Sequence, residues 1–318
     1  MDNNSLSLAF DFGGTKLAAG LVNTRDGTII DHRKNPTPSQ KGAKASLAKM
    51  VQMGKSLIEH NPGFHPIHIG VSFGGSVSKD RKSIGRSIHI HGWDQFPITD
   101  YLGDIFRLPV FLDNDANAAA LGEWTFGAGK KAASMLYIQL STGVGSGIII
   151  DGKIWRGEGL GAEFGHVKVN GWDTLCVCGQ KGCIESIASG WALKDSGQQL
   201  LNRNPVNQNL NLLCKGDIEK IDARILFSSM RQGDYSSAQI INNAFEALGI
   251  ALANAIVIMD PSVVVLGGGL CKSKDSFSSI LDESLKKYLL SAIYKRLCIR
   301  YSFFEGKETL VGAALLDL

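Results

Sequence analysis

The chain has 318 residues, of which 44% are hydrophobic and 20% are charged, and its formal net charge is +3. This composition fits one or two globular domains with sizeable cores and excludes a linker or a low-complexity tail. Basic residues are spread along the chain, so no nucleic-acid groove is indicated. The opening residues lack the pattern of a signal peptide, and no segment approaches the roughly 20 apolar residues that span a bilayer. We therefore expect a cytoplasmic protein.

The predicted elements alternate between strands and helices. Three short strands joined by Gly-containing turns come first, followed by a helix, a strand, a helix, a strand and an Ala-rich helix: 6–12, 16–22, 27–35, 44–60, 66–73, 98–106, 109–113 and 114–124. After a second pair of apolar runs, polar helices, a long apolar helix, a strand ending in glycines and a closing helix are predicted: 135–150, 190–235, 241–260, 262–269 and 308–318. The pattern indicates a mixed α/β protein. The layout of 135–150 repeats that of 6–22, which suggests two similar domains facing a cleft.

One histidine and three cysteines lie within a stretch of eighteen residues: His166, Cys176, Cys178 and Cys183. In a reducing compartment, four such close ligands favour a metal site over a disulfide. A Cys3His set forms a closed tetrahedral zinc site, so the expected role is structural. Free thiols and a reactive C-x-C redox pair remain as alternatives.

Two carboxylates lie near the ends of this stretch. Glu163 precedes His166 by three residues, and Glu185 follows Cys183 by two. A metal that fixes the loop would fix both carboxylates as hydrogen-bond acceptors for a polar ligand. The alternative is that both side chains are simply exposed to solvent.

Three glycine-rich turns follow apolar runs, at 11–16, 141–147 and 267–269. Glycine allows the backbone to approach phosphate closely and lets its N–H groups converge on oxygen. The turns match neither a Walker A loop nor a dinucleotide fingerprint, and each by itself is typical of an ordinary hairpin. Together they suggest a nucleotide held between two domains.

Five of these segments carry a family resemblance: DFGGTK, Asp-Asn-Asp-Ala-Asn at 113–117, STGVGSG, Glu-Phe-Gly-His at 163–166, and CVCGQKGCIE. They resemble the ROK (repressor, open reading frame, kinase) family of sugar kinases and regulators, from residue 8 to about residue 315. The resemblance implies an α/β, actin-like (ribonuclease H-like) two-domain ATPase fold, with a central cleft and a zinc-containing loop. The expected domains are 1–118, completed by about 305–318, and 119–304. The family commonly forms homodimers.

The resemblance also implies roles for single residues. Asp115 is the expected general base, and its place at a helix N-terminus favours the ionised carboxylate; a simple helix cap is the alternative. The implied sugar ligands are Gly75, Asn114, Asp115, Glu163, His166 and Glu185. The implied contacts to ATP and Mg²⁺ are Asp11, Gly13, Gly14, Thr15, Lys16, Thr142, Gly143, Gly267 and Gly268, with Asp11 on Mg²⁺ or its water. The implied ligands of structural Zn²⁺ are His166, Cys176, Cys178 and Cys183.

Two departures from the family pattern bear on the sugar. The chain has Gly74-Gly75-Ser76 where the family often has Pro-Gly-Pro, and His89 stands at the position of the usual sugar-contacting Asn. His89 either donates to a hydroxyl or is a satisfied loop residue. We expect an ATP-dependent hexose kinase acting on glucose at the 6-position. N-acetylmannosamine, N-acetylglucosamine and fructose are the alternative substrates.

Other functions of the family are less favoured. Its repressors carry a helix-turn-helix ahead of the sugar-binding part, which would need about 60 further residues, whereas DFGGTK begins here at residue 11. A sugar sensor without phosphotransfer would be expected to lack Asp115 or the phosphate turns, which this chain has. We expect hexose and ATP as ligands, and neither nucleic acid nor a membrane as a partner.

Overall fold

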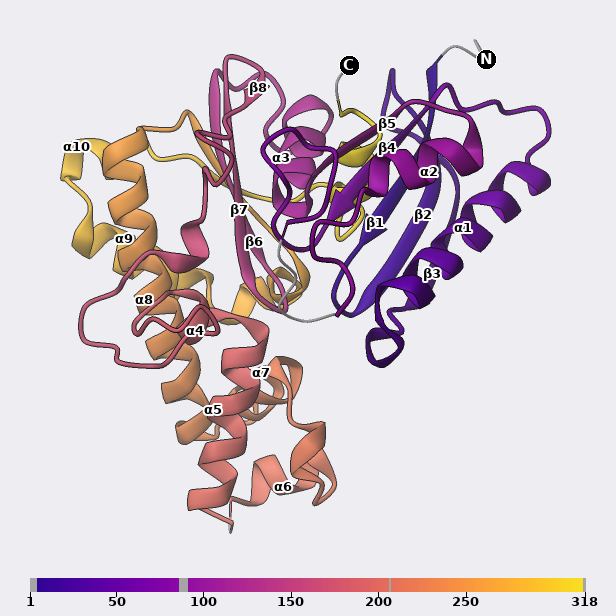
Figure 1. Cartoon of the computed structure of the whole chain (residues 1–318). Coiled ribbons are helices and arrows are strands. Elements are labelled where there is room, and N and C mark those ends of the chain that lie inside the picture. Colours follow the sequence, from indigo (N-terminus) through magenta and orange to yellow (C-terminus); the bar gives the residue numbers. More distant parts are fainter. Residues whose placement is uncertain (1–4, 86–90, 206, 317–318) are drawn as a thin grey trace. The chain divides into compact units, whose positions relative to one another are not determined.

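The computed structural model describes residues 5–85, 91–205 and 207–316, and Figure 1 shows their helices and strands. The chain forms two compact units. The first comprises Met1–Tyr137, Gly147–Ala162 and Ser302–Leu318, and the second comprises Ile138–Ser146 and Glu163–Tyr301. The domain bounds expected from the sequence, 1–118 with 305–318 and 119–304, stay a prediction, because compactness alone does not define an independently folding domain.

The first unit contains a five-stranded sheet in the order β3-β2-β1-β4-β5. Its strands are β1 (Leu6–Phe12), β2 (Lys16–Asn23), β3 (Ile29–Pro36), β4 (His68–Phe73) and β5 (Val110–Asn114). β1, β2 and β3 form an antiparallel meander, and β4 and β5 continue the sheet in parallel with β1. Every residue of β1 and β4 is buried, which is typical of strands covered on both faces.

The alternation of side chains along β1 explains how its two faces are covered. Leu8, Phe10 and Phe12 belong to a large apolar core that also includes side chains of α1 (Gly42–His60) and α2 (Ile98–Phe106). Ala9, on the opposite face, packs in a second cluster with Leu310 and Ala313 of α11 (Glu308–Ala313) and with Ala314, which follows the helix. Large side chains thus fill one face of the sheet and small ones allow close approach on the other.

The helix α11 packs on the sheet and against α3 (Asp115–Thr125). The two helices approach so closely that a Cβ atom at Gly312 would lie 1.6 Å from the Ala118 carbonyl oxygen. The closing helix predicted for 308–318 is present but shorter than expected, because it ends at Ala313. Because α11 lies far along the chain from β1 and α3, the final segment completes the first unit.

The second sheet has the order β10-β9-β6-β7-β8. Its strands are β6 (Ser134–Leu140), β7 (Val144–Ile150), β8 (Lys153–Ile154), β9 (Val263–Gly267) and β10 (Ile299–Tyr301). The Gly-rich turn predicted between two apolar runs does join two strands, β6 and β7, as the turn at 13–15 joins β1 and β2. Each of the two expected turns therefore lies between neighbouring strands.

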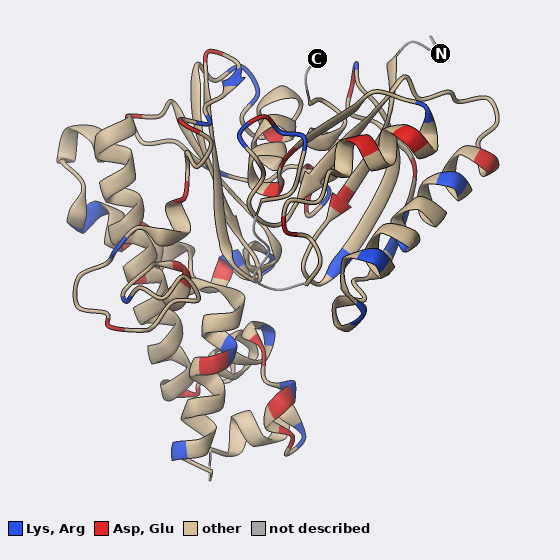
Figure 2. Cartoon of the chain, in the orientation of Figure 1, with Lys and Arg blue, Asp and Glu red and all other residues tan. Residues whose placement is uncertain are grey.

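The remaining helices lie in the second unit and confirm the polar helical stretch and the long apolar helix. They are α4 (Glu185–Ala188), α5 (Gly190–Arg203), α6 (Gln208–Cys214), α7 (Ala223–Arg231), α8 (Tyr235–Met259), α9 (Ser278–Tyr288) and α10 (Ser291–Tyr294). Short 3-10 helices are η2 (Ser39–Lys41), η3 (Phe164–His166), η4 (Ile218–Lys220) and η5 (Gly269–Ser276). Figure 2 shows Lys and Arg interspersed with Asp and Glu in both units.

The helix α8 corrects one expectation about membranes. By length and composition it is apolar enough to cross a bilayer, although we expected from the sequence that no segment comes close. It packs against α7 and α9, and Phe245 on α8 stacks on Phe277 with ring centroids 3.9 Å apart. Core helices of globular units pass the same test, and the buried face of α8 is that of a core helix.

Candidate functional site

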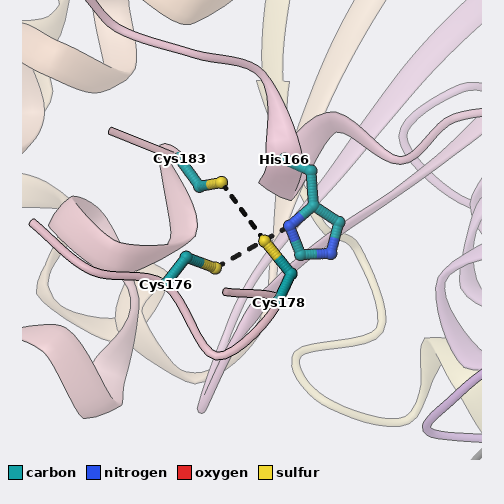
Figure 3. Close-up of side chains that lie close together, drawn as sticks. All are labelled: His166, Cys176, Cys178 and Cys183. Carbon is teal, nitrogen blue, oxygen red and sulfur yellow. Dashed lines mark hydrogen bonds between the residues drawn. The ribbon is translucent and has the colours of Figure 1, made fainter. Parts of the chain in front are cut away.

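The four residues of the predicted zinc site lie together in the second unit (Figure 3). Their ligand atoms all lie within 4.8 Å of one another. Cys178 Sγ is 3.7 Å from Cys183 Sγ, and Cys176 Sγ is 3.8 Å from His166 Nδ1. His166 ends η3 and Cys183 precedes α4, so the cluster joins two short structured segments through the loop between them.

The spacing of these atoms fits a tetrahedral zinc ion. Bonds of about 2.3 Å to sulfur and about 2.0 Å to nitrogen place tetrahedral ligand atoms roughly 3.5 to 3.8 Å apart. A disulfide would need sulfurs about 2.05 Å apart, and all six cysteines are free. Burial raises the pKa of the Cys176 thiol to about 12, whereas a hydrogen bond from the Gln180 backbone lowers the pKa of the Cys178 thiol. The donor set, with no open position, suits a structural ion.

A lysine without a predicted role lies beside this cluster. Lys168 Nζ is 3.0 Å from Cys183 Sγ, and residues 168 and 183 form an isolated β-bridge. Three thiolates and one neutral histidine around Zn²⁺ carry a net negative charge. A lysine ammonium in this place offsets that charge, which is a typical outer-shell contribution to a metal site.

The carboxylates expected to bind sugar lie on either side of the cluster. Glu163 directly precedes η3 without a side-chain capping bond, and Glu185 is the first residue of α4. Glu163 is exposed and Glu185 is partly buried. Partial desolvation nevertheless raises the pKa of the Glu163 carboxyl; His166 opposes this rise and the Glu185 carboxylate adds to it. These electrostatic interactions bring Glu163, His166 and Glu185 into one neighbourhood. Because Nδ1 of His166 points into the cluster, Nε2 is the ring nitrogen left for other partners.

The turn at 141–144 lies against this neighbourhood. The Val144 N–H donates to Glu185 Oε2 over 3.0 Å, and the Gly190 N–H donates to the Ser141 carbonyl oxygen over 2.8 Å. The third glycine-rich turn is close to the end of β6, because a Cβ atom at Gly268 would lie 2.3 Å from the Leu140 carbonyl oxygen. The structure therefore brings two of the three predicted phosphate turns together in the second unit.

The remaining turn, at 11–16, lies in the first unit and contains a buried carboxylate. Asp11 accepts hydrogen bonds from Ser72 Oγ at 2.9 Å and from Thr309 Oγ1 at 3.2 Å. Burial raises the pKa of Asp11, while Lys16, Ser72 and Thr309 lower it. The Gly13 N–H donates to the Lys16 carbonyl oxygen over 3.0 Å and closes the turn. A buried carboxylate supported by two hydroxyls is suited to a cation or its bound water.

The predicted base lies at the start of α3. Asn114 is the N-cap residue of this helix, and its Oδ1 accepts from the N–H groups of Ala116 and Asn117. Asp115 follows, with Oδ1 2.9 Å from the Ala116 nitrogen. Asn114 Nδ2 donates to the Gly75 carbonyl oxygen over 3.2 Å. The structure thus brings Gly75, Asn114 and Asp115 together in the first unit, and assigns the cap to Asn114.

An ion pair at Asp113, the residue before Asn114, was not predicted. Arg156 donates from Nε to Asp113 Oδ2 over 2.7 Å, and Asp113 is 3% exposed. Asp113 Oδ1 accepts from the Asn114 N–H and from Asn117 Nδ2. The acidic residue directly before Asn114 was the available sequence signal, since a buried acid requires a partner. His89, the predicted departure at the sugar site, lies outside the described residues.

Comparison with known proteins identifies the family. The model of the ROK family matches residues 7–318. The chain belongs to the ROK family. Nearly the whole chain is included in this match, so both units are parts of one ROK protein.

Two named sugar kinases and one solved structure are similar to this chain over nearly their full length. The glucokinase of Thermotoga maritima is 32% identical, over 96% of this chain and 95% of its own. The N-acetylmannosamine kinase of Yersinia pseudotuberculosis is 33% identical, over 97% of both chains. A ROK family glucokinase from Streptomyces griseus, solved in complex with glucose and AMPPNP, is 33% identical with a TM-score of 0.85, over 97% of this chain and 98% of its own. The predicted actin-like α/β fold of the ROK kinases is confirmed by this likeness.

Proposed function

We propose that the chain is an ATP-dependent hexose kinase that phosphorylates the 6-hydroxyl of glucose, with Asp115 as general base. The observation that carries this proposal is that the N-cap residue of α3 is Asn114 and not Asp115. A carboxylate in the next position is then not required for capping. A helix N-terminus favours negative charge, and a general base must carry it. The full-length similarity to glucokinases supports the same reaction.

The sugar is assigned to polar groups in each unit. In the first unit these are the Gly75 backbone, Asn114 and Asp115. Asn114 Nδ2 carries a second N–H besides the one donated to Gly75, and we assign it to a sugar hydroxyl. In the second unit Glu163, Glu185 and His166 Nε2 accept from or donate to further hydroxyls.

The nucleotide is assigned to the three glycine-rich turns. Asp11 would hold Mg²⁺ or its water, and the proposed phosphate contacts are Gly13, Gly14, Thr15, Lys16, Thr142, Gly143, Gly267 and Gly268. Convergent N–H groups and a lysine offset charge on the phosphoryl oxygens, which is the main requirement of phosphoryl transfer. Zn²⁺, held by His166 and the three cysteines, would fix the loop between Glu163 and Glu185 without taking part in the chemistry.

A coupled assay of ADP formation tests this function. Purified protein is supplied with ATP, Mg²⁺ and one of four sugars: glucose, N-acetylmannosamine, N-acetylglucosamine or fructose. We expect turnover with glucose and loss of turnover when Mg²⁺ is chelated. Full activity without Mg²⁺ would contradict the role of Asp11, and no turnover with any of the four sugars would refute the proposed kinase.

N-acetylmannosamine is the second candidate substrate, because a kinase for that sugar is 33% identical to this chain and the Thermotoga maritima glucokinase is 32% identical. A higher kcat/KM for N-acetylmannosamine than for glucose would favour this alternative. A cytoplasmic location and a homodimer are parts of the same proposal, and size-exclusion chromatography with light scattering tests the dimer.

A further inference from the structure

We propose that Glu185 positions the backbone of the turn Ser141–Val144, here called the phosphate turn. The zinc loop, defined as residues 163–185, would then support nucleotide binding as well as sugar binding. This inference rests on the proposed function, which assigns phosphate to Thr142 and Gly143. It adds a second task for Glu185, carried out by the carboxylate oxygen that faces the turn.

The contact between Glu185 and the phosphate turn is direct. The Val144 N–H donates to Glu185 Oε2 over 3.0 Å, and a hydrogen bond to a carboxylate is stronger than one between neutral groups. A Cβ atom at Gly143 would lie 2.7 Å from the same oxygen. Only glycine therefore allows the carboxylate to lie this close to the turn, and the carboxylate fixes the peptide between Gly143 and Val144.

A second segment of the zinc loop packs on the same turn. A Cβ atom at Gly165 would lie 2.2 Å from the Val144 carbonyl oxygen, so the backbone at Gly165 is in close contact with it. The turn is also held from α5, where the Gly190 and Trp191 N–H groups donate to the Ser141 and Thr142 carbonyl oxygens. The N–H and the carbonyl of Val144 thus meet two different parts of the zinc loop.

Both of these parts are joined to zinc ligands over a very short distance along the chain. Gly165 directly precedes His166, and Glu185 follows Cys183 by two residues. The Ile184 N–H donates to the Val167 carbonyl oxygen over 2.9 Å, which ties the two segments to each other. An ion bound by His166 and Cys183 would hold both segments in register against Val144, and its loss would release both.

Two substitutions at Glu185 separate the turn from the sugar. Glu185→Gln keeps an oxygen that can accept from the Val144 N–H, but it replaces the other oxygen with a donor. Glu185→Ala removes both. We expect Glu185→Gln to keep the affinity for AMPPNP within about 3-fold of wild type while weakening glucose binding. We expect Glu185→Ala to weaken AMPPNP binding by about 10-fold or more, as loss of a charge-assisted hydrogen bond implies.

The measurement is titration calorimetry with Mg²⁺ and AMPPNP in the absence of sugar, followed by titration with glucose. Glu163→Gln is the matched control, because Glu163 belongs to the same proposed sugar site without a described hydrogen bond to the phosphate turn. It should weaken glucose binding and leave the affinity for AMPPNP unchanged. Wild-type affinity for AMPPNP in Glu185→Ala would overturn the inference.

Hydrogen exchange provides a readout that needs no ligand. Amide exchange in the peptide covering 138–146 should be faster in Glu185→Ala and in zinc-stripped protein than in wild type, and near the wild-type rate in Glu163→Gln. Wild-type exchange rates in both Glu185→Ala and the zinc-stripped protein would refute the inference, even if the chain bound no nucleotide. Failure of wild-type protein to bind AMPPNP would instead count against the proposed kinase, so the two failures are distinguishable.

Discussion

Arg156 binds Asp113 through two of its nitrogens: Nε and Nη2 lie 2.7 and 2.6 Å from the same oxygen, Oδ2. The side chain of Asp113 is 4% exposed, and its other oxygen accepts from the backbone N–H of Asn114. Arg156 therefore neutralises a buried charge and, through it, holds the residue that precedes the proposed base.

Replacing Arg156 with Met should lower kcat by about 10-fold and reduce thermal stability. The variant leaves Asp113 buried with its Oδ2 unpaired, and a lost hydrogen bond to a charged group costs about 1.5–3 kcal/mol. Arg156→Lys should be intermediate, because an ammonium restores the charge but not both N–H bonds. Steady-state kinetics and thermal unfolding check these effects.

Arg107→Met is the control for that substitution. Its partner Asp104 is 3.9 Å away and both side chains are 83% exposed, so the pair contributes little. Wild-type kcat and unfolding temperature in Arg156→Met would contradict the positioning role.

Replacing Asp115 with Asn should lower kcat by about 10²- to 10⁴-fold, the usual worth of general-base assistance. The fold and glucose binding should remain nearly intact, because Asn114 still caps α3 and the new side chain keeps a hydrogen-bonding oxygen. Thermal unfolding, glucose titration and kcat are measured on one preparation. A variant that turns over at the wild-type rate would show that Asp115 is not the base.

Purified protein should contain about one zinc ion per chain, measured by elemental analysis. Cys183→Ser should lose the metal and much of its activity, because structural zinc binding is coupled to local folding. Cys298→Ser is the matched control, since Cys298 lies outside the cluster; it should retain zinc. Active wild-type protein without zinc would be inconsistent with the proposed structural zinc site.

Stability should fall as the pH is lowered below about 6.5, in part because of His68. Its ring Nε2 is 3.0 Å from the Ala314 carbonyl oxygen, and burial lowers its pKa despite that contact. The unfolded chain then binds a proton at a higher pH than the folded chain does, with an unfolded pKa of about 6.5. His68 thus contributes stability above this pH that is lost on acidification.

The variant His68→Gln isolates this contribution, because glutamine can still donate to Ala314. Urea unfolding at pH 7.5 and pH 5.5 should show a larger loss for wild type than for the variant, by at most about 1.4 kcal/mol per pH unit. Equal losses in the two proteins would mean that His68 does not contribute.

The sequence predicted those features that are encoded locally. The strands of the first sheet follow from short apolar runs between glycine turns, and the zinc cluster follows from four ligands within one loop. Arg156 and Asp113 lie 43 positions apart, and Thr309 lies 298 positions from Asp11. No local pattern pairs such residues, because the fold alone decides which buried acid meets which donor. The end of α11 was missed because apolar residues continue beyond Ala313 without a helix-breaking residue.

Because α11 packs on the first sheet, the first unit can be completed only after the end of the chain has been synthesised. During synthesis on the ribosome, β1 to β5 emerge first, and the whole second unit follows before Ser302–Leu318 is made. Until then, the face of the sheet that carries Ala9 and Ala18 lacks the cover that Leu310 and Ala313 provide. The second unit can therefore complete its core before the last segment of the first unit has been synthesised. Until that segment emerges, the nascent chain exposes an apolar sheet surface of the kind that chaperones bind.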